Sequence, residues 1–118
     1  MKRILIIDDE PDILEMLSFI LEDEGYDVLT ANSGNSALTL IKSGEFKPDL
    51  AISDIQMSDG DGVKFLKDSK LEFPQLKVIL MTGFSNYNKE ELVKLGALDI
   101  ISKPFDLDEI LKSLKNLL

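Results

Sequence analysis

Short apolar runs alternate with longer amphipathic stretches along the whole chain. The short runs are rich in β-branched residues, which is typical of strands. We expect strands at residues 3–7, 26–31, 50–53, 77–81 and 99–102. Because these runs are apolar almost throughout, they predict a parallel sheet that is buried on both faces.

A stretch with helical periodicity follows each predicted strand. In the first, apolar residues recur at i, i+3, i+4, i+7 and i+8: Ile13, Met16, Leu17, Ile20 and Leu21. That spacing builds one apolar helix face. Pro11 suits the first helical turn, and Gly25 suits a helix end. We expect helices at residues 12–24, 34–43, 62–71, 88–95 and 106–118.

The strict alternation of strand and helix predicts an α/β fold. Right-handed crossovers between parallel strands give a doubly wound sheet, covered by helices on both sides. Five strands favour the order 2-1-3-4-5, which is the flavodoxin-like (βα)5 arrangement. The chain contains no linker and no low-complexity tract, so residues 1–118 are expected to form a single domain.

Composition excludes several kinds of chemistry. The 118 residues contain no cysteine and no histidine, so disulfides, zinc–thiolate sites and histidine bases are all excluded. The net charge of −9 repels nucleic-acid phosphates and anionic lipid heads, so we expect neither direct nucleic-acid binding nor membrane binding. No stretch is typical of a signal peptide or a membrane span, which favours the cytoplasm.

Polar residues follow the predicted strands at the edge where a doubly wound sheet binds its ligands. Asp8 and Asp9 come after the first strand, and Asp54 comes after the third. Thr82 follows the fourth strand and Lys103 the fifth. The topology therefore gathers three carboxylates, one hydroxyl and one ammonium in one cleft.

Crowded carboxylates repel one another unless a cation joins them. Their hard oxygen ligands suit Mg²⁺ or Mn²⁺. A metal there would let an anionic phosphoryl donor approach, and one carboxylate could then attack phosphorus to form an aspartyl phosphate. A lysine and a hydroxyl would hold the remaining phosphoryl oxygens.

Taken together and in order, these motifs resemble the receiver domain of two-component response regulators. The resemblance covers residues 2–118 and is carried by Asp8-Asp9, Asp54-Ile55-Gln56-Met57 followed by Gly62, Thr82-Gly83 and Lys103-Pro104-Phe105. It implies that Asp54 is the phosphoacceptor. It also implies that Asp9, Asp54 and the backbone carbonyl of Gln56 bind Mg²⁺ (or Mn²⁺) directly, while Asp8 acts mainly through a metal-bound water.

The resemblance implies further roles at the phosphoryl group. Lys103 would pair with it, Thr82 would be the switch hydroxyl, and the Lys103–Pro104 peptide would be cis. Two positions depart from the usual family pattern. Ser58 stands where a proline is common, and Ile100 occupies the switch position that usually holds an aromatic residue.

The function that the resemblance implies is the phosphoacceptor switch of a two-component phosphorelay. A histidine kinase or a histidine phosphotransfer domain would supply the phosphoryl group. The change would be read on the face of the fourth helix, fifth strand and fifth helix by an output domain or downstream protein. Such a domain is not a classical enzyme, although it catalyses its own phosphorylation and dephosphorylation. Homodimerisation on phosphorylation is a further hypothesis.

Three alternatives remain at this point. A receiver-like interaction module would work without phosphorylation, and failure to bind Mg²⁺ would favour it. A flavin carrier needs a hydroxyl- and glycine-rich phosphate loop, whereas Asp8-Asp9-Glu10 would repel the phosphate of FMN. A phosphatase with an Asp nucleophile is disfavoured because the chain is short for a substrate-enclosing cap and no Asp lies two residues after Asp54.

Overall fold

The computed structural model describes residues 1–57, 61–83 and 88–118. The expectation for Ser58 therefore lies outside the described residues. The strands form one parallel sheet in the order β2-β1-β3-β4-β5. This confirms the predicted doubly wound α/β fold, with its change of strand order between β1 and β3.

The strands and helices alternate along the chain without exception in the described residues. The strands are β1 (Arg3–Ile7), β2 (Asp27–Ala31), β3 (Leu50–Asp54), β4 (Lys77–Thr82) and β5 (Asp99–Ser102). The helices are α1 (Pro11–Asp23), α2 (Gly34–Ser43), α3 (Gly62–Glu72), α4 (Lys89–Leu95) and α5 (Leu107–Leu117). The predicted bounds differ from these by at most one residue at either end, so the hydrophobic pattern was a sufficient guide.

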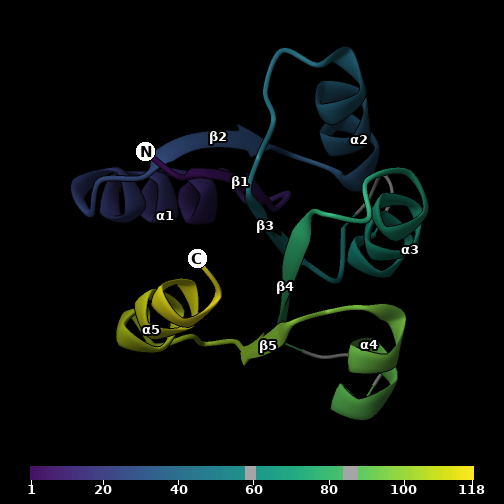
Figure 1. Ribbon diagram of the computed structural model, residues 1–118. Coiled ribbons are helices and arrows are strands. Elements are labelled where there is room, and N and C mark those ends of the chain that lie inside the picture. The colour runs from purple at the N-terminus through teal and green to yellow at the C-terminus, as the bar shows by residue number, and fades with distance from the viewer. Residues whose placement is uncertain (58–60, 84–87) are drawn as a thin grey trace.

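Two hydrophobic clusters cover the two faces of the sheet. α1 and α5 lie on one face, and α2, α3 and α4 lie on the other (Figure 1). Successive β1 residues point to opposite faces, so Ile4 and Ile6 pack with α1 and α5, while Leu5 and Ile7 pack with the other three helices. This double burial explains why the inner strands β1, β3 and β4 are largely apolar.

Short connections hold the helix starts close to the carboxyl ends of the strands. Three residues separate the end of β1 from Pro11, where α1 begins, and the N-cap Glu10 forms no side-chain cap. α3 is capped by Asp61, whose Oδ1 accepts a hydrogen bond from the Lys64 N–H at 2.8 Å. This cap fixes the start of α3 next to the end of β3.

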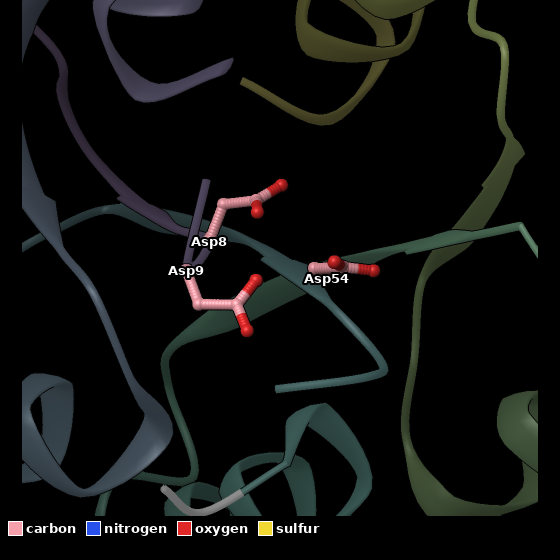
Figure 2. Close-up of side chains that lie close together, drawn as sticks. All are labelled: Asp8, Asp9 and Asp54. Carbon is pink, nitrogen blue, oxygen red and sulfur yellow. The ribbon is translucent and has the colours of Figure 1, made fainter. Parts of the chain in front are cut away.

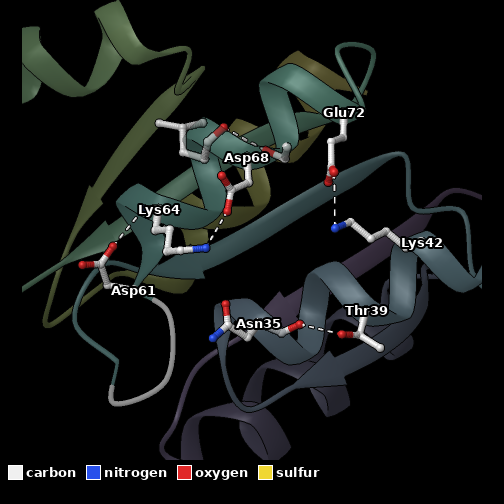
Figure 3. Close-up of polar contacts among 9 residues, drawn as sticks. Asn35, Thr39, Lys42, Asp61, Lys64, Asp68 and Glu72 are labelled. Atoms are coloured by element: carbon white, nitrogen blue, oxygen red, sulfur yellow. Dashed lines mark hydrogen bonds and ion pairs between the residues drawn. The ribbon is translucent and has the colours of Figure 1, made fainter.

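The outer surfaces of α2 and α3 carry exposed ion pairs (Figure 3). Lys42 of α2 pairs with Glu72 of α3 at 3.3 Å. Lys64 and Asp68 pair at 2.7 Å along α3. Among the residues described, none of the helices has the length and apolar character needed to cross a bilayer.

Candidate functional site

Three carboxylates meet at the carboxyl ends of β1 and β3. Asp8 directly follows β1, and Asp54 is the last residue of the neighbouring β3. Figure 2 shows both with Asp9 beside them, the three side chains close together. One oxygen from each carboxylate lies within 4.8 Å of the others. The structure thus brings together three residues that lie in two separate segments of the sequence.

The three carboxylates differ in burial. Asp8 is fully buried, Asp54 is 7% exposed and Asp9 is exposed. The Asp8 Oδ1 accepts a hydrogen bond from the Glu10 N–H at 3.0 Å. Residue types do not reveal this contribution of the Glu10 backbone, because every residue except proline carries a main-chain N–H. This hydrogen bond holds the Asp8 side chain inside the site.

Lys103 reaches this cluster from the end of β5. Its Nζ donates to Asp8 Oδ2 at 3.1 Å and to Asp54 Oδ2 at 3.2 Å. The Lys103 N–H donates to the Thr82 carbonyl at 2.7 Å, and the Lys103–Pro104 peptide bond is cis, the isomer that the resemblance implied. We call Asp8, Asp54 and Lys103 the buried ionic cluster.

Burial raises the pKa of Asp54 above its ordinary value. The Lys103 ammonium opposes that shift, the charge of Asp8 adds to it, and a backbone hydrogen bond from Gln56 lowers it, leaving the pKa raised overall. Burial alone would lower the pKa of Lys103, but contacts with Asp8 and Asp54 outweigh it, so that pKa is also raised. Both shifts indicate that the cluster favours additional positive charge.

Gly62 lets α3 begin directly against this cluster. A Cβ at Gly62 would lie 2.2 Å from the carbonyl oxygen of Asp54 and 2.9 Å from the Cα of Ile55. The Gly62 N–H donates to the Ile55 carbonyl at 2.8 Å. Glycine is therefore required here by close backbone approach, and the first turn of α3 fixes the chain that carries Asp54.

The donor set fits a hard divalent cation. Asp8, Asp9 and Asp54 offer only carboxylate oxygens, and one of the three is exposed to solvent. Mg²⁺ prefers oxygen ligands and keeps several of its waters, so a site with few protein ligands and an open side suits it. The geometry can hold such a cation next to the Asp54 oxygens.

The remaining predicted residues lie around the cluster. Thr82 ends β4 and is half-buried. Gln56 is exposed, two residues beyond Asp54. Ile100 is only 3% exposed and pairs with Leu80 in the sheet, within the hydrophobic cluster under α2, α3 and α4. The switch position thus belongs to the core in this structure.

Comparison with known proteins gives a uniform result. A family model described as the response regulator receiver domain matches residues 4–115. Sporulation initiation phosphotransferase F of Bacillus subtilis (strain 168) is 35% identical over 118 residues, covering 99% of this chain and 94% of that protein. Regulatory protein AtoC of Escherichia coli (strain K12) is 39% identical over 109 residues, covering 92% of this chain. The chain spans only 23% of AtoC, and it spans a similar share of several other relatives.

Solved structures share the same fold. The response regulator protein TrrA of Thermotoga maritima, in complex with Mg²⁺-BeF, has a TM-score of 0.89 and 36% identity, with full coverage of both chains. Chemotaxis protein CheY4 of Vibrio cholerae has a TM-score of 0.88 and 31% identity, covering 100% of this chain and 99% of that one.

Proposed function

This chain belongs to the response regulator receiver domain family, and from that premise we propose that it is the phosphoacceptor switch of a two-component phosphorelay. Asp54 takes the phosphoryl group. The observation that carries the proposal is the contact of the Lys103 Nζ with Asp54 and Asp8 inside a largely buried cluster. The contact places a positively charged ammonium group beside the acceptor carboxylate, where it can bind a phosphoryl oxygen after transfer.

Three residues of this chain have separate roles in phosphoryl transfer. An Asp54 carboxylate oxygen attacks the phosphorus of a partner's phosphohistidine, so that a P–O bond forms as the P–N bond breaks and the imidazole leaves with the partner. The Lys103 ammonium, kept charged by its raised pKa, moves from the carboxylates toward a phosphoryl oxygen. The Thr82 hydroxyl, at the end of the neighbouring β4, donates to another phosphoryl oxygen.

The carboxylates Asp9 and Asp54 would hold Mg²⁺ directly with the carbonyl of Gln56, while Asp8 acts mainly through a water. When bound, Mg²⁺ offsets the carboxylate charge and orients the phosphoryl oxygens. The proximity of carboxylate oxygens from Asp8, Asp9 and Asp54 supports this assignment.

Two surfaces of the domain, one on α1 and one on the α4–β5–α5 side, expose apolar side chains suited to partners. α1 lies beside the cluster and exposes Phe19 (76%) and Met16 (38%), which suits docking of a histidine kinase or histidine phosphotransfer domain. On the α4–β5–α5 side, Val93 (55%) and Leu98 (47%) are exposed. These side chains suit contact with an output domain, a downstream protein or a second copy of the chain. Residues 1–118 act as one receiver domain in the cytoplasm.

Phosphorylation would work by shifting an existing equilibrium between two conformations. A shift from 1:99 to 99:1 needs about 5.5 kcal/mol of differential stabilisation. Contacts of a phosphoryl group with Lys103, Thr82 and the metal, formed in one conformation only, supply such a difference. Ile100 of β5 is buried and pairs with Leu80, two residues before Thr82 in β4. We expect the packing of Ile100 to change on phosphorylation.

The test is intact-mass spectrometry after incubation with Mg²⁺ and acetyl phosphate. We expect one added phosphoryl group on the native chain and none when EDTA replaces Mg²⁺. The Asp54→Asn variant should remain unmodified. Asp68→Asn is the matched control, because it removes the same charge from a half-buried position on α3, and it should be modified like the native chain.

A missing adduct has two explanations that a second measurement separates. If hydrolysis is fast, adding beryllofluoride with Mg²⁺ still changes the NMR spectrum around Asp54. If neither the adduct nor that change is observed, the phosphoacceptor proposal fails and an interaction module that works without phosphorylation replaces it.

A further inference from the structure

A cavity lies at the amino-terminal ends of β1, β3 and β4, at the opposite end of the sheet from Asp54. Its volume is about 450 Å³, and it is lined by Lys2 before β1, Asp49 before β3 and Lys77 at the start of β4. We call it the basal cavity. This volume falls within the range of small-molecule sites, which runs from roughly 300 to 1,000 Å³.

The walls of the basal cavity include apolar side chains from different segments. Ile41 of α2 and Leu76 before β4 are buried, and Phe73 at the end of α3 is half-buried. An aromatic ring and two branched aliphatic side chains thus line a space that lies partly open to solvent. Such a surface favours the apolar body of a ligand.

The polar part of the lining carries unneutralised positive charge. Lys2, Lys47 and Lys77 all line the cavity, in a chain of net charge −9. Within residues 1–57, 61–83 and 88–118, neither Lys2 nor Lys47 forms an ion pair or a side-chain hydrogen bond. The Asp49 Oδ2 already accepts from the Arg3 N–H at 2.8 Å. With three lysines against Asp49, the lining is net positive.

Helix ends account for only one of these lysines. The helices of a doubly wound sheet end at this side, and their terminal carbonyls attract cations. The Lys77 ammonium does donate to the Leu117 carbonyl at the end of α5. Lys2 and Lys47 stand in the segments before β1 and after α2, and within the described residues neither donates to a helix-terminal carbonyl. Their ammonium groups are therefore available to a ligand in the cavity.

We propose that the basal cavity binds a small amphipathic anion with an aromatic body and one carboxylate or sulfonate group. The body packs on Ile41, Phe73 and Leu76, and the anionic group lies between Lys2 and Lys47. This site is separate from Asp54 and does not depend on phosphorylation. Because both lysines are exposed, the charge contribution is moderate and sensitive to salt.

The test is a fluorescence titration of the 118-residue chain with the anionic dye anilinonaphthalene sulfonate. We expect saturable binding at one site, and weaker binding at high salt. The double variant Lys2→Gln, Lys47→Gln should bind about tenfold more weakly, since two exposed charges are lost. The matched control Lys112→Gln, Lys115→Gln removes the same charge from the exposed side of α5 and should bind like the native chain.

Two further titrations test whether the dye binds in the basal cavity. The uncharged counterpart phenylnaphthylamine should bind without responding to either lysine pair. Phe19→Ala, which removes the exposed aromatic ring of α1, should leave the dye affinity unchanged. The proposal is overturned if no saturable binding occurs, if both lysine pairs have equal effects, or if Phe19→Ala abolishes the binding.

Discussion

The same residue types form ion pairs in two contrasting regions of this molecule. In the buried ionic cluster, the Lys103 side chain is 20% exposed, against 0% for Asp8 and 10% for Asp54. On α2 and α3, the Lys42 and Glu72 side chains are 54% and 44% exposed. The Lys42–Glu72 contact of 3.3 Å is similar in length to the Lys103 contacts of 3.1 and 3.2 Å, so distance alone does not distinguish these pairs.

The two kinds of pair differ in the free energy of desolvation that folding requires. Exposed pairs exchange hydration for a screened attraction, so they contribute little in either direction. Buried carboxylates lose their hydration, and one ammonium shared by Asp8 and Asp54 does not fully replace it. The raised pKa of Asp54 expresses that imbalance. A cluster kept at such a cost is a candidate for chemistry, whereas the surface pairs are not.

The largest expected effect comes from disturbing the backbone under the buried cluster. Gly62→Ala places a Cβ 2.2 Å from the Asp54 carbonyl oxygen, so the free energy of unfolding should fall by about 3 kcal/mol. Gly83→Ala is the matched control, because its nearest neighbour outside the adjoining residues is the Lys103 Cβ at 3.9 Å. Urea denaturation measures both, and equal stabilities would show that α3 does not need this close approach.

Removing the shared cation should have the next largest effect. Lys103→Ala leaves Asp8 and Asp54 without their cation, and we expect a loss of about 2 kcal/mol, below that of a fully buried pair. Because the folded pKa of Lys103 is raised, its stabilisation is fully present below the ordinary lysine pKa and is lost only as pH rises through the folded value.

Mg²⁺ should affect the stability of the Lys103→Ala variant differently from that of the native chain. Mg²⁺ should raise the melting temperature of Lys103→Ala more than that of the native chain, since no ammonium then competes for the carboxylates. Lys42→Ala should respond to Mg²⁺ like the native chain. If Lys103→Ala and Lys42→Ala lose equal stability, the contrast between buried and exposed pairs is wrong.

Neutralising the acceptor should stabilise the metal-free protein. Asp54→Asn removes a charge that burial disfavours, so we expect a gain of about 1 kcal/mol at pH 7, within the usual range for single substitutions. A raised folded pKa means that the native chain loses stability as pH rises from the ordinary aspartate value through the folded one. The gain should therefore vanish at pH 3. Denaturation at both pH values checks this, and a loss of stability at pH 7 would contradict it.

The smallest effect should come from the surface pair between α2 and α3. Lys42→Ala removes the contact with Glu72 and should cost at most about 0.5 kcal/mol. Most of that loss should disappear in 1 M salt, where the screening length is roughly 3 Å. A loss that persists in high salt would indicate that the Lys42 stem stabilises the helices by packing.

The sequence was a good guide wherever local pattern decides the structure. The apolar runs located the strands within one residue, because burial on both faces makes the inner strands β1, β3 and β4 largely apolar. The predicted strand order was enough to place Asp8 and Asp54 at one edge of the sheet. The cis peptide before Pro104 came from the resemblance alone.

Other features depend on contacts that no local pattern specifies. The Lys103 ammonium contacts both carboxylates. Whether it reaches them depends on how β5 packs against β4, which the local sequence does not specify. The reason for glycine at position 62 is a backbone oxygen eight residues earlier in the chain. The basal cavity was not foreseen at all, because its lining comes from separate loops and helix ends.

The most direct test of the central claim identifies which carboxylate carries the phosphoryl group. After incubation with Mg²⁺ and acetyl phosphate, borohydride reduces an aspartyl phosphate to homoserine, and peptide mass spectrometry then locates the altered residue. The account predicts homoserine at position 54, with Asp8, Asp9 and the half-buried Asp68 unchanged. Homoserine at any other aspartate, with Asp54 intact, would contradict it.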